Sequence, residues 1–86
     1  MKWETTSSVA WQMVGPEAVL VDVATGTTLG LNPTGSFIWK RLRENDDAAI
    51  ATELAREYGI PREEADRDVA DFLELLRDRG FVSPKE

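Results

Sequence analysis

Apolar and polar residues alternate at the start of the chain, before any helical spacing begins. Large apolar residues occupy every second position at Val9, Trp11 and Met13. This period of two predicts a half-buried strand over residues 8–14. The Gly-Pro pair at 15–16 then interrupts the pattern, so a turn is expected there.

Two further strands are expected close behind the first. Residues 18–23 are rich in valine, and residues 27–31 alternate leucine with small or polar residues. Gly26 can adopt a positive φ in the turn between them, and Asp22 can accept hydrogen bonds from the turn backbone. These two segments are therefore predicted to form an antiparallel hairpin.

Helical spacing begins after Asn32-Pro33. Asn32 can accept hydrogen bonds from the first turn, and Pro33 suits the first helical position because no N–H is needed there. Gly59-Ile60 and Gly80-Phe81 are typical helix ends, in which glycine is left-handed and the next apolar residue folds back. Three helices are expected, over residues 33–43, 48–58 and 62–79.

The resulting order, β-β-β-α-α-α, predicts a winged-helix-like α+β domain with a three-stranded antiparallel sheet. Residues 1–86 are expected to form one domain with an ordered core over about residues 9–82. Val82 can add a short final strand. Trp11 and Trp39 are assigned to the core, whereas Trp3 precedes every expected strand and is either loose or folded onto the sheet.

Composition restricts the chemistry available to the chain. It contains neither cysteine nor histidine, which removes thiolate metal sites, disulfides and the usual general base. Catalysis would depend on carboxylates, lysine, arginine and one tyrosine. We therefore expect a protein that is not an enzyme, with no catalytic residues, no metal and no cofactor.

The net charge of −6 also bears on partners. A domain that binds duplex nucleic acid normally carries a basic face, so DNA and RNA are not expected. No apolar run is long enough to span a bilayer and no secretory signal is present, so a cytoplasmic protein without membrane contact is expected.

The tight turn between the second and third helices leaves one alternative open, an acidic winged-helix transcription regulator. The third helix would then face DNA, and phosphates would repel most of its exposed side chains. A solvated helix face with interleaved charges explains these residues better than a DNA contact or a paired-carboxylate site. They are Glu63, Glu64, Arg67, Asp71, Glu74 and Asp78.

The strand expected over residues 27–31 is the most informative element. Three strands joined by short turns cannot close a barrel, so two edges remain. This segment contains no Lys, Glu or Pro to protect an edge. If it lies at an edge, it can accept a strand from a peptide, unless a loop, a terminus or a second copy of the chain covers it. A homodimer through this edge strand is therefore also considered.

The ordered set of motifs resembles one known family. The run VLVDVATGTTLGLNPTGSFIW at residues 19–39, followed by Leu42, matches a strand ending in Asp, a Gly turn, a strand ending in Leu-Asn and a small-residue helix start. Residues 50–59 and 63–82 resemble the later helices. On these residues the chain resembles the PqqD-like family, the peptide-recognition domains of ribosomal-peptide modification pathways. Pro61 departs from the family, which often has Asp before the third helix.

The resemblance implies a non-catalytic adaptor that binds the leader segment of a precursor peptide. It implies strand addition beside residues 27–31, packing against the third helix, and presentation to a leader peptidase, cyclase or radical enzyme. The match is closer to free-standing members from lasso-peptide clusters. The expected peptide-binding residues along the third strand are Thr28, Leu29, Gly30, Leu31 and Asn32, and those on one flank of the third helix are Asp66, Ala70, Leu73 and Arg77. The opposite flank, with Asp68, Leu75 and Arg79, stays open. Acidic groups near this groove predict a partly basic leader.

Overall fold

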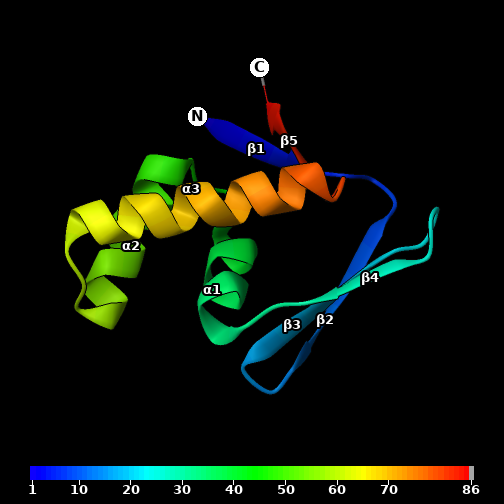
Figure 1. Cartoon of the computed structure of the whole chain (residues 1–86), viewed down its shortest axis with the longest axis horizontal. Helices are drawn as coiled ribbons and strands as arrows, with labels where there is room; N and C mark the ends of the chain where they lie inside the picture. Colours follow the sequence, from blue (N-terminus) through cyan, green and yellow to red (C-terminus); the bar gives the residue numbers. More distant parts are fainter. Residues whose placement is uncertain (86) are drawn as a thin grey trace.

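The computed structural model describes residues 1–85 as an α+β fold with two small sheets and three helices (Figure 1). In chain order the elements are β1 (Lys2–Thr5), β2 (Val9–Val14), β3 (Glu17–Asp22), β4 (Thr27–Gly30), α1 (Pro33–Arg41), α2 (Asp47–Tyr58), α3 (Arg62–Asp78) and β5 (Val82–Lys85).

The predicted three-stranded antiparallel sheet is confirmed, with strand order β2-β3-β4. Trp11 pairs with Leu20, and Leu20 pairs with Leu29, so these three side chains share the face that packs on the core. The alternate residues, such as Val19 and Gly30, lie on the opposite face. Asp22 accepts a hydrogen bond from the Ala24 N–H at 3.0 Å, as the turn chemistry predicted.

The second sheet was not expected in full. β1 pairs with β5 in an antiparallel ribbon, so the two ends of the described chain lie side by side (Figure 1). Trp3 belongs to β1, lies opposite Pro84 and packs half-buried against the core. The sequence pattern missed β1 because its partner lies at the far end of the chain and four residues are too few for a clear period. The short strand expected at Val82 is present.

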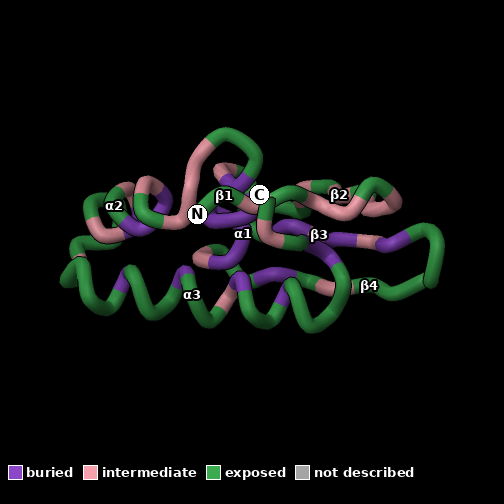
Figure 2. Tube along the Cα trace, turned by 90° about the horizontal axis from the view of Figure 1, so that it is seen from above, coloured by how far each residue is buried: buried purple, intermediate pink, exposed green. Residues whose placement is uncertain are grey.

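The core fills the space between the three-stranded sheet, the β1–β5 ribbon and the helices (Figure 2). Trp39 lies at its centre with 1% exposure and meets the half-buried Trp11 edge to face, with ring centroids 6.2 Å apart. Phe81, directly after the Gly80 helix end, is fully buried. Tyr58 of α2 is 44% exposed and meets Phe37 edge to face.

Caps mark several of the helix boundaries, and those at Asn32, Gly59 and Gly80 were predicted from the sequence. The Asn32 side chain accepts from the Gly35 N–H at 2.7 Å, and Asp46 accepts from the Ala49 N–H at 2.9 Å. Gly59 and Gly80 both have positive φ, 64° and 82°, as expected for left-handed helix ends. These caps mark the starts of α1 and α2 and the ends of α2 and α3, and the Asn32 cap places the start of α1 just after β4.

A side chain of α1 completes the hydrogen bonding where β4 ends. The Leu31 N–H donates to the Ala18 carbonyl at 2.8 Å, as a continued ladder requires. The Ala18 N–H does not return this bond to Leu31, but donates to Ser36 Oγ at 2.7 Å, a buried contact. The Ser36 hydroxyl in turn donates to the Asn32 carbonyl at 2.8 Å. Ser36 therefore ties β3, the end of β4 and the first turn of α1 together.

Substitution of Ser36 by alanine is expected to lower the free energy of unfolding by about 1–3 kcal/mol, because the Ala18 N–H would be buried without an acceptor. Urea denaturation followed by circular dichroism measures the change. The exposed Ser83→Ala variant is the matched control, with an expected change within about 0.5 kcal/mol. Equal stability of the two variants would show that the Ser36 bond contributes little.

Candidate functional site

β4 lies at an edge of the three-stranded sheet, a position that the sequence left undecided for residues 27–31. β3 covers one side of it, and on the other side the ladder is open. In Figures 1 and 2, β4 lies on the same side of the molecule as α3, whereas the other edge strand, β2, lies away from that helix. An added strand would therefore meet α3 only at the β4 edge.

The register of β4 determines which backbone groups are free. The bond from the Leu31 N–H to the Ala18 carbonyl makes these residues a hydrogen-bonded pair. Bonded and non-bonded pairs alternate along an antiparallel ladder, so Leu29 is also bonded to β3 through Leu20. The N–H and C=O groups of Thr28 and Gly30 consequently point away from β3, toward the open edge.

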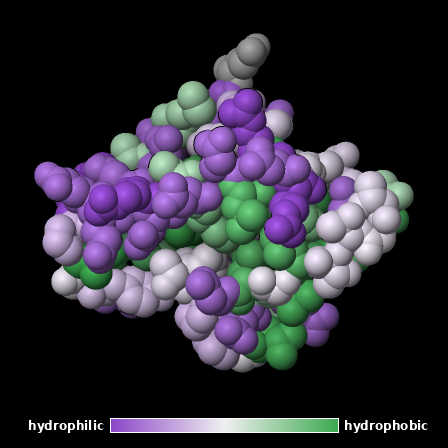
Figure 3. All heavy atoms as spheres, in the orientation of Figure 1, coloured by the Kyte–Doolittle hydropathy of each residue, from purple (hydrophilic) through white to green (hydrophobic). Residues whose placement is uncertain are grey.

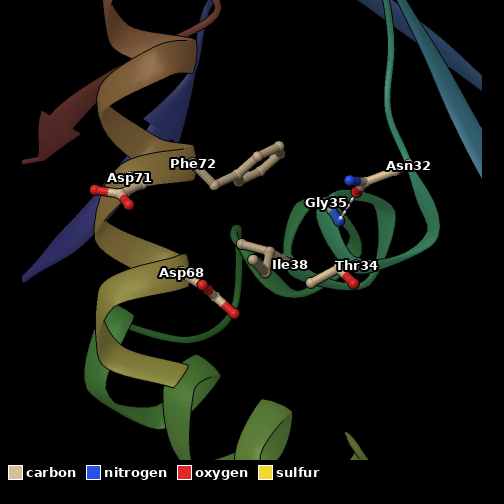
Figure 4. A pocket seen from close by; sticks show the side chains of 7 residues that line it. All are labelled: Asn32, Thr34, Gly35, Ile38, Asp68, Asp71 and Phe72. Atoms are coloured by element: carbon tan, nitrogen blue, oxygen red, sulfur yellow. Dashed lines mark hydrogen bonds between the residues drawn. The ribbon is translucent and has the colours of Figure 1, made fainter. Parts of the chain in front are cut away.

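A pocket of about 290 Å³ lies where β4 passes into α1, between that corner and the middle of α3 (Figure 4). Its lining residues are Asn32, Thr34, Gly35, Ile38, Asp68, Asp71 and Phe72. Figure 3 shows apolar residues gathered at the centre of this face, between the hydrophilic surface of α3 and β4. The pocket begins at Asn32, two residues after the end of β4, and we call the open edge and the pocket together the β4–α3 groove.

One close contact shapes the pocket. A Cβ atom built on Gly35 would lie 2.8 Å from Cε1 of Phe72 and 3.2 Å from Oδ1 of Asn32. The absence of a side chain at Gly35 therefore lets the Phe72 ring lie directly on the first turn of α1. This packing holds α1 and α3 together and leaves one side of the ring facing the groove (Figure 4).

The charges of the groove are acidic. Asp68 and Asp71 are exposed on α3, and both line the pocket. The ion pairs found among residues 1–85 use other acidic groups, namely Asp47, Glu53 and Asp66. The pocket therefore presents two carboxylates beside an apolar surface.

The structure separates the expected site residues into two groups. Thr28, Leu29, Gly30, Leu31 and Asn32 lie together along β4 and at the start of α1. Thr28 and Gly30 offer main-chain groups, while the Leu29 and Leu31 side chains pack on the core. The Asn32 carbonyl already accepts the Ser36 N–H at 2.9 Å.

The expected residues of α3 do not share a surface with β4. Asp66 and Ala70 line a separate hollow with Asp47 and Ala48 of α2, and Asp66 accepts a hydrogen bond from Arg62 at 2.9 Å. Leu73 is a core residue with 1% exposure. Arg77 is exposed and, at 100° per residue, falls with Asp66 and Ala70 on that side of the helix.

The flank that faces the groove is the one left open at the outset, which includes Asp68. Asp71 and Phe72 belong with it, and neither was among the residues expected at the site. A helical wheel shows two flanks beside the apolar stripe of this helix but not which of them faces the sheet. Phe72 is identified as a groove residue by its packing against Gly35, which lies 37 positions earlier in the chain.

Two classes of site are not found in residues 1–85. No group of three or more acidic side chains is placed so that it could hold a metal ion. No helix there is long and apolar enough to cross a membrane.

These features define a small α+β domain with an open sheet edge beside a helix-lined pocket. A family model described as "Coenzyme PQQ synthesis protein D (PqqD)" matches residues 17–82, and the chain belongs to this family. The resemblance stated from the sequence is thereby confirmed. A search of curated protein sequences found no match.

Two solved structures are similar over nearly their whole length. One is described as "TbiB1 in Complex with the TbiA(beta) Leader Peptide"; it is 31% identical, with a TM-score of 0.89, over 100% of this chain and 99% of that chain. The other, "Lasso peptide synthetase B1 complexed with the leader peptide", is 27% identical, with a TM-score of 0.90, over 98% of this chain and 100% of that chain. Both structures contain a bound leader peptide.

The Gly35→Ala variant is expected to be destabilised by about 1–3 kcal/mol, because the new methyl group would overlap the Phe72 ring. Thermal denaturation measures the loss. The double variant Gly35→Ala/Phe72→Leu should recover part of the stability, because leucine lacks the Cε1 atom that causes the overlap.

Gly30→Ala is the matched control, since a Cβ at Gly30 has nothing within 4 Å. We expect it to be neutral or slightly stabilising. A Gly35→Ala protein as stable as Gly30→Ala would show that the Phe72 ring can move aside freely.

Proposed function

We propose that this protein is a non-catalytic adaptor that binds the leader segment of a ribosomally made precursor peptide. The observation that carries the proposal is the open edge of β4, which lies beside the pocket of α1 and α3. It is supported by the two structural neighbours, whose own complexes contain leader peptides. The leader would add to the sheet as an antiparallel fourth strand.

Main-chain hydrogen bonds would supply affinity that depends little on leader sequence. Thr28 and Gly30 each offer one N–H and one C=O toward the open edge, so an added strand can form two bonded pairs with them. The edge strand itself is short and uncharged. Strand addition therefore requires no rearrangement of β4.

Side chains of the leader would be selected by the groove. In an antiparallel pair, directly opposite residues place their side chains on the same face. Leader residues opposite Leu29 and Leu31 would thus point toward α3, where Phe72 and Ile38 offer apolar contact. The groove flank of α3, with Asp68 and Phe72, takes the role first assigned to Asp66 and Ala70.

The adaptor would then present the bound precursor to a separate modifying enzyme, such as a leader peptidase, cyclase or radical enzyme. This division is supported by the composition of the chain, which has no histidine to act as a base and no cysteine to act as a nucleophile. Incubation of precursor with this protein alone should leave the precursor mass unchanged. Addition of the modifying enzyme should give a reaction that depends on the adaptor.

The Gly30→Pro variant tests strand addition directly. Proline is tolerated at an edge strand where the N–H faces outward, so the β3–β4 ladder should survive. The variant removes one donor from the open edge, and we expect Kd for peptide to rise at least about tenfold. The probe is a peptide selected from a displayed random library by the wild-type protein, measured by fluorescence anisotropy.

Gly30→Ala, which retains the N–H, is the control and should bind within about threefold of wild type. Circular dichroism checks that both variants are folded. Unchanged binding by a folded Gly30→Pro protein would exclude the β4 edge. A gel shift with duplex DNA, together with no saturable peptide binding, would support the acidic winged-helix regulator instead.

A further inference from the structure

The pocket of the β4–α3 groove combines two kinds of surface. Phe72 and Ile38 line it with apolar atoms, and Asp68 and Asp71 line it with carboxylates. In Figure 4 the Phe72 ring and the Asp68 carboxylate extend from α3 toward the first turn of α1, whereas the Asp71 carboxylate points toward the outer side of the helix. A ligand that satisfies both surfaces needs an apolar stem and a polar or charged end.

The carboxylate at Asp68 lacks a compensating cation on its own helix. Its neighbours one turn away are Glu64, Asp71 and Phe72, of which two are also acidic. Like charges at this spacing repel each other, so the flank is less stable than one with mixed charges. None of the ion pairs found in residues 1–85 involves Asp68 or Asp71.

The opposite wall limits where a cation can lie. It is formed by Asn32, Thr34 and Gly35, the cap and first turn of α1, which carry the positive end of the helix dipole. A cation is favoured on the α3 side of the pocket, near the carboxylates and away from that turn. Thr34 adds a hydroxyl and no charge.

Arginine side chains in this chain already lie over aromatic rings. The Arg41 guanidinium lies 3.4 Å from the centroid of the Phe37 ring, and that of Arg43 lies 5.5 Å from the Trp11 ring. Phe72 likewise offers an aromatic ring to a cation, and it lines the pocket together with two aspartates. The pocket therefore suits a side chain with an aliphatic stem and a cationic end.

We propose, on the basis of the proposed function, that this pocket selects one lysine or arginine of the bound leader. The register assigns its position. The pocket begins at Asn32, so the side chain belongs to the peptide residue opposite Leu31, which faces α3. In an antiparallel strand this residue lies two positions before the one opposite Leu29. Its stem packs on Phe72 and Ile38, and its charge lies beside Asp68, with Asp71 one turn further along the rim of the pocket.

Paired synthetic peptides test the assignment. A library-selected peptide is compared with copies in which each lysine or arginine in turn is replaced by norleucine, which keeps the stem and removes the charge. One of these norleucine peptides should bind the wild-type protein about tenfold more weakly than the parent peptide does, as expected for loss of a charge-assisted contact. The Asp68→Asn/Asp71→Asn variant should bind that norleucine peptide and the parent peptide within about twofold of each other.

Glu63→Gln/Glu74→Gln is the matched control, because it removes two charges from the face of α3 away from the pocket. It should keep the tenfold preference. High salt should reduce the preference in wild type, since the Debye length falls to about 3 Å at 1 M. All four substituted positions are exposed, and circular dichroism confirms folding.

The outcomes separate this inference from the proposed function. If selected peptides bind wild type but no replacement matters, or if the control variant loses the preference equally, the basic-residue pocket is excluded and strand addition stands. If no peptide gives saturable binding, the proposed function fails as well. A preference that disappears only in the Asp68/Asp71 variant supports the assignment.

Discussion

The hydrogen bond from the Ala18 N–H to Ser36 Oγ holds together the part of the molecule on which the rest depends. At this point the sheet ladder stops, because the chain must leave β4 and begin α1. An unbonded N–H inside the core would be costly, and Ser36 supplies the acceptor that the strand no longer provides. The same hydroxyl donates to the Asn32 carbonyl, so the strand end, the helix cap and the pocket wall are positioned by one residue.

A small core makes this arrangement important. The chain has 86 residues, so its stability rests on few buried side chains and on caps that satisfy backbone groups. Trp39, Leu20 and Phe81 come from three different parts of the sequence and meet in one cluster. The edge strand contributes little to that cluster beyond Leu29, which leaves its outer side free for a role other than folding.

Much of this fold could be predicted from the sequence because the determining signals are local. The period of two in β2, the cap at Asn32 and the left-handed glycines at 59 and 80 each act within a few residues. The sequence left undecided whether residues 27–31 form an edge, and the strand order β2-β3-β4 places β4 there. The ordered motifs were sufficient to indicate the family.

The features that could not be predicted depend on contacts between distant segments. β1 exists because β5 pairs with it across nearly the whole length of the chain. The groove flank of α3 depends on the direction in which that helix crosses α1, which periodicity does not contain. The close contact between Gly35 and Phe72 results from that crossing, but neither residue on its own indicates the direction of α3.

Under the proposed function, the open ladder of β4 has a consequence for how the sequences of leader peptides can diverge. A strand added there would direct every second side chain toward α3 and the remainder into solvent. Only half of the positions in the paired segment would then be under steric constraint, while the others could drift freely. A short bound segment of this kind could have many sequences, provided that the two or three residues directed toward α3 keep their size and polarity.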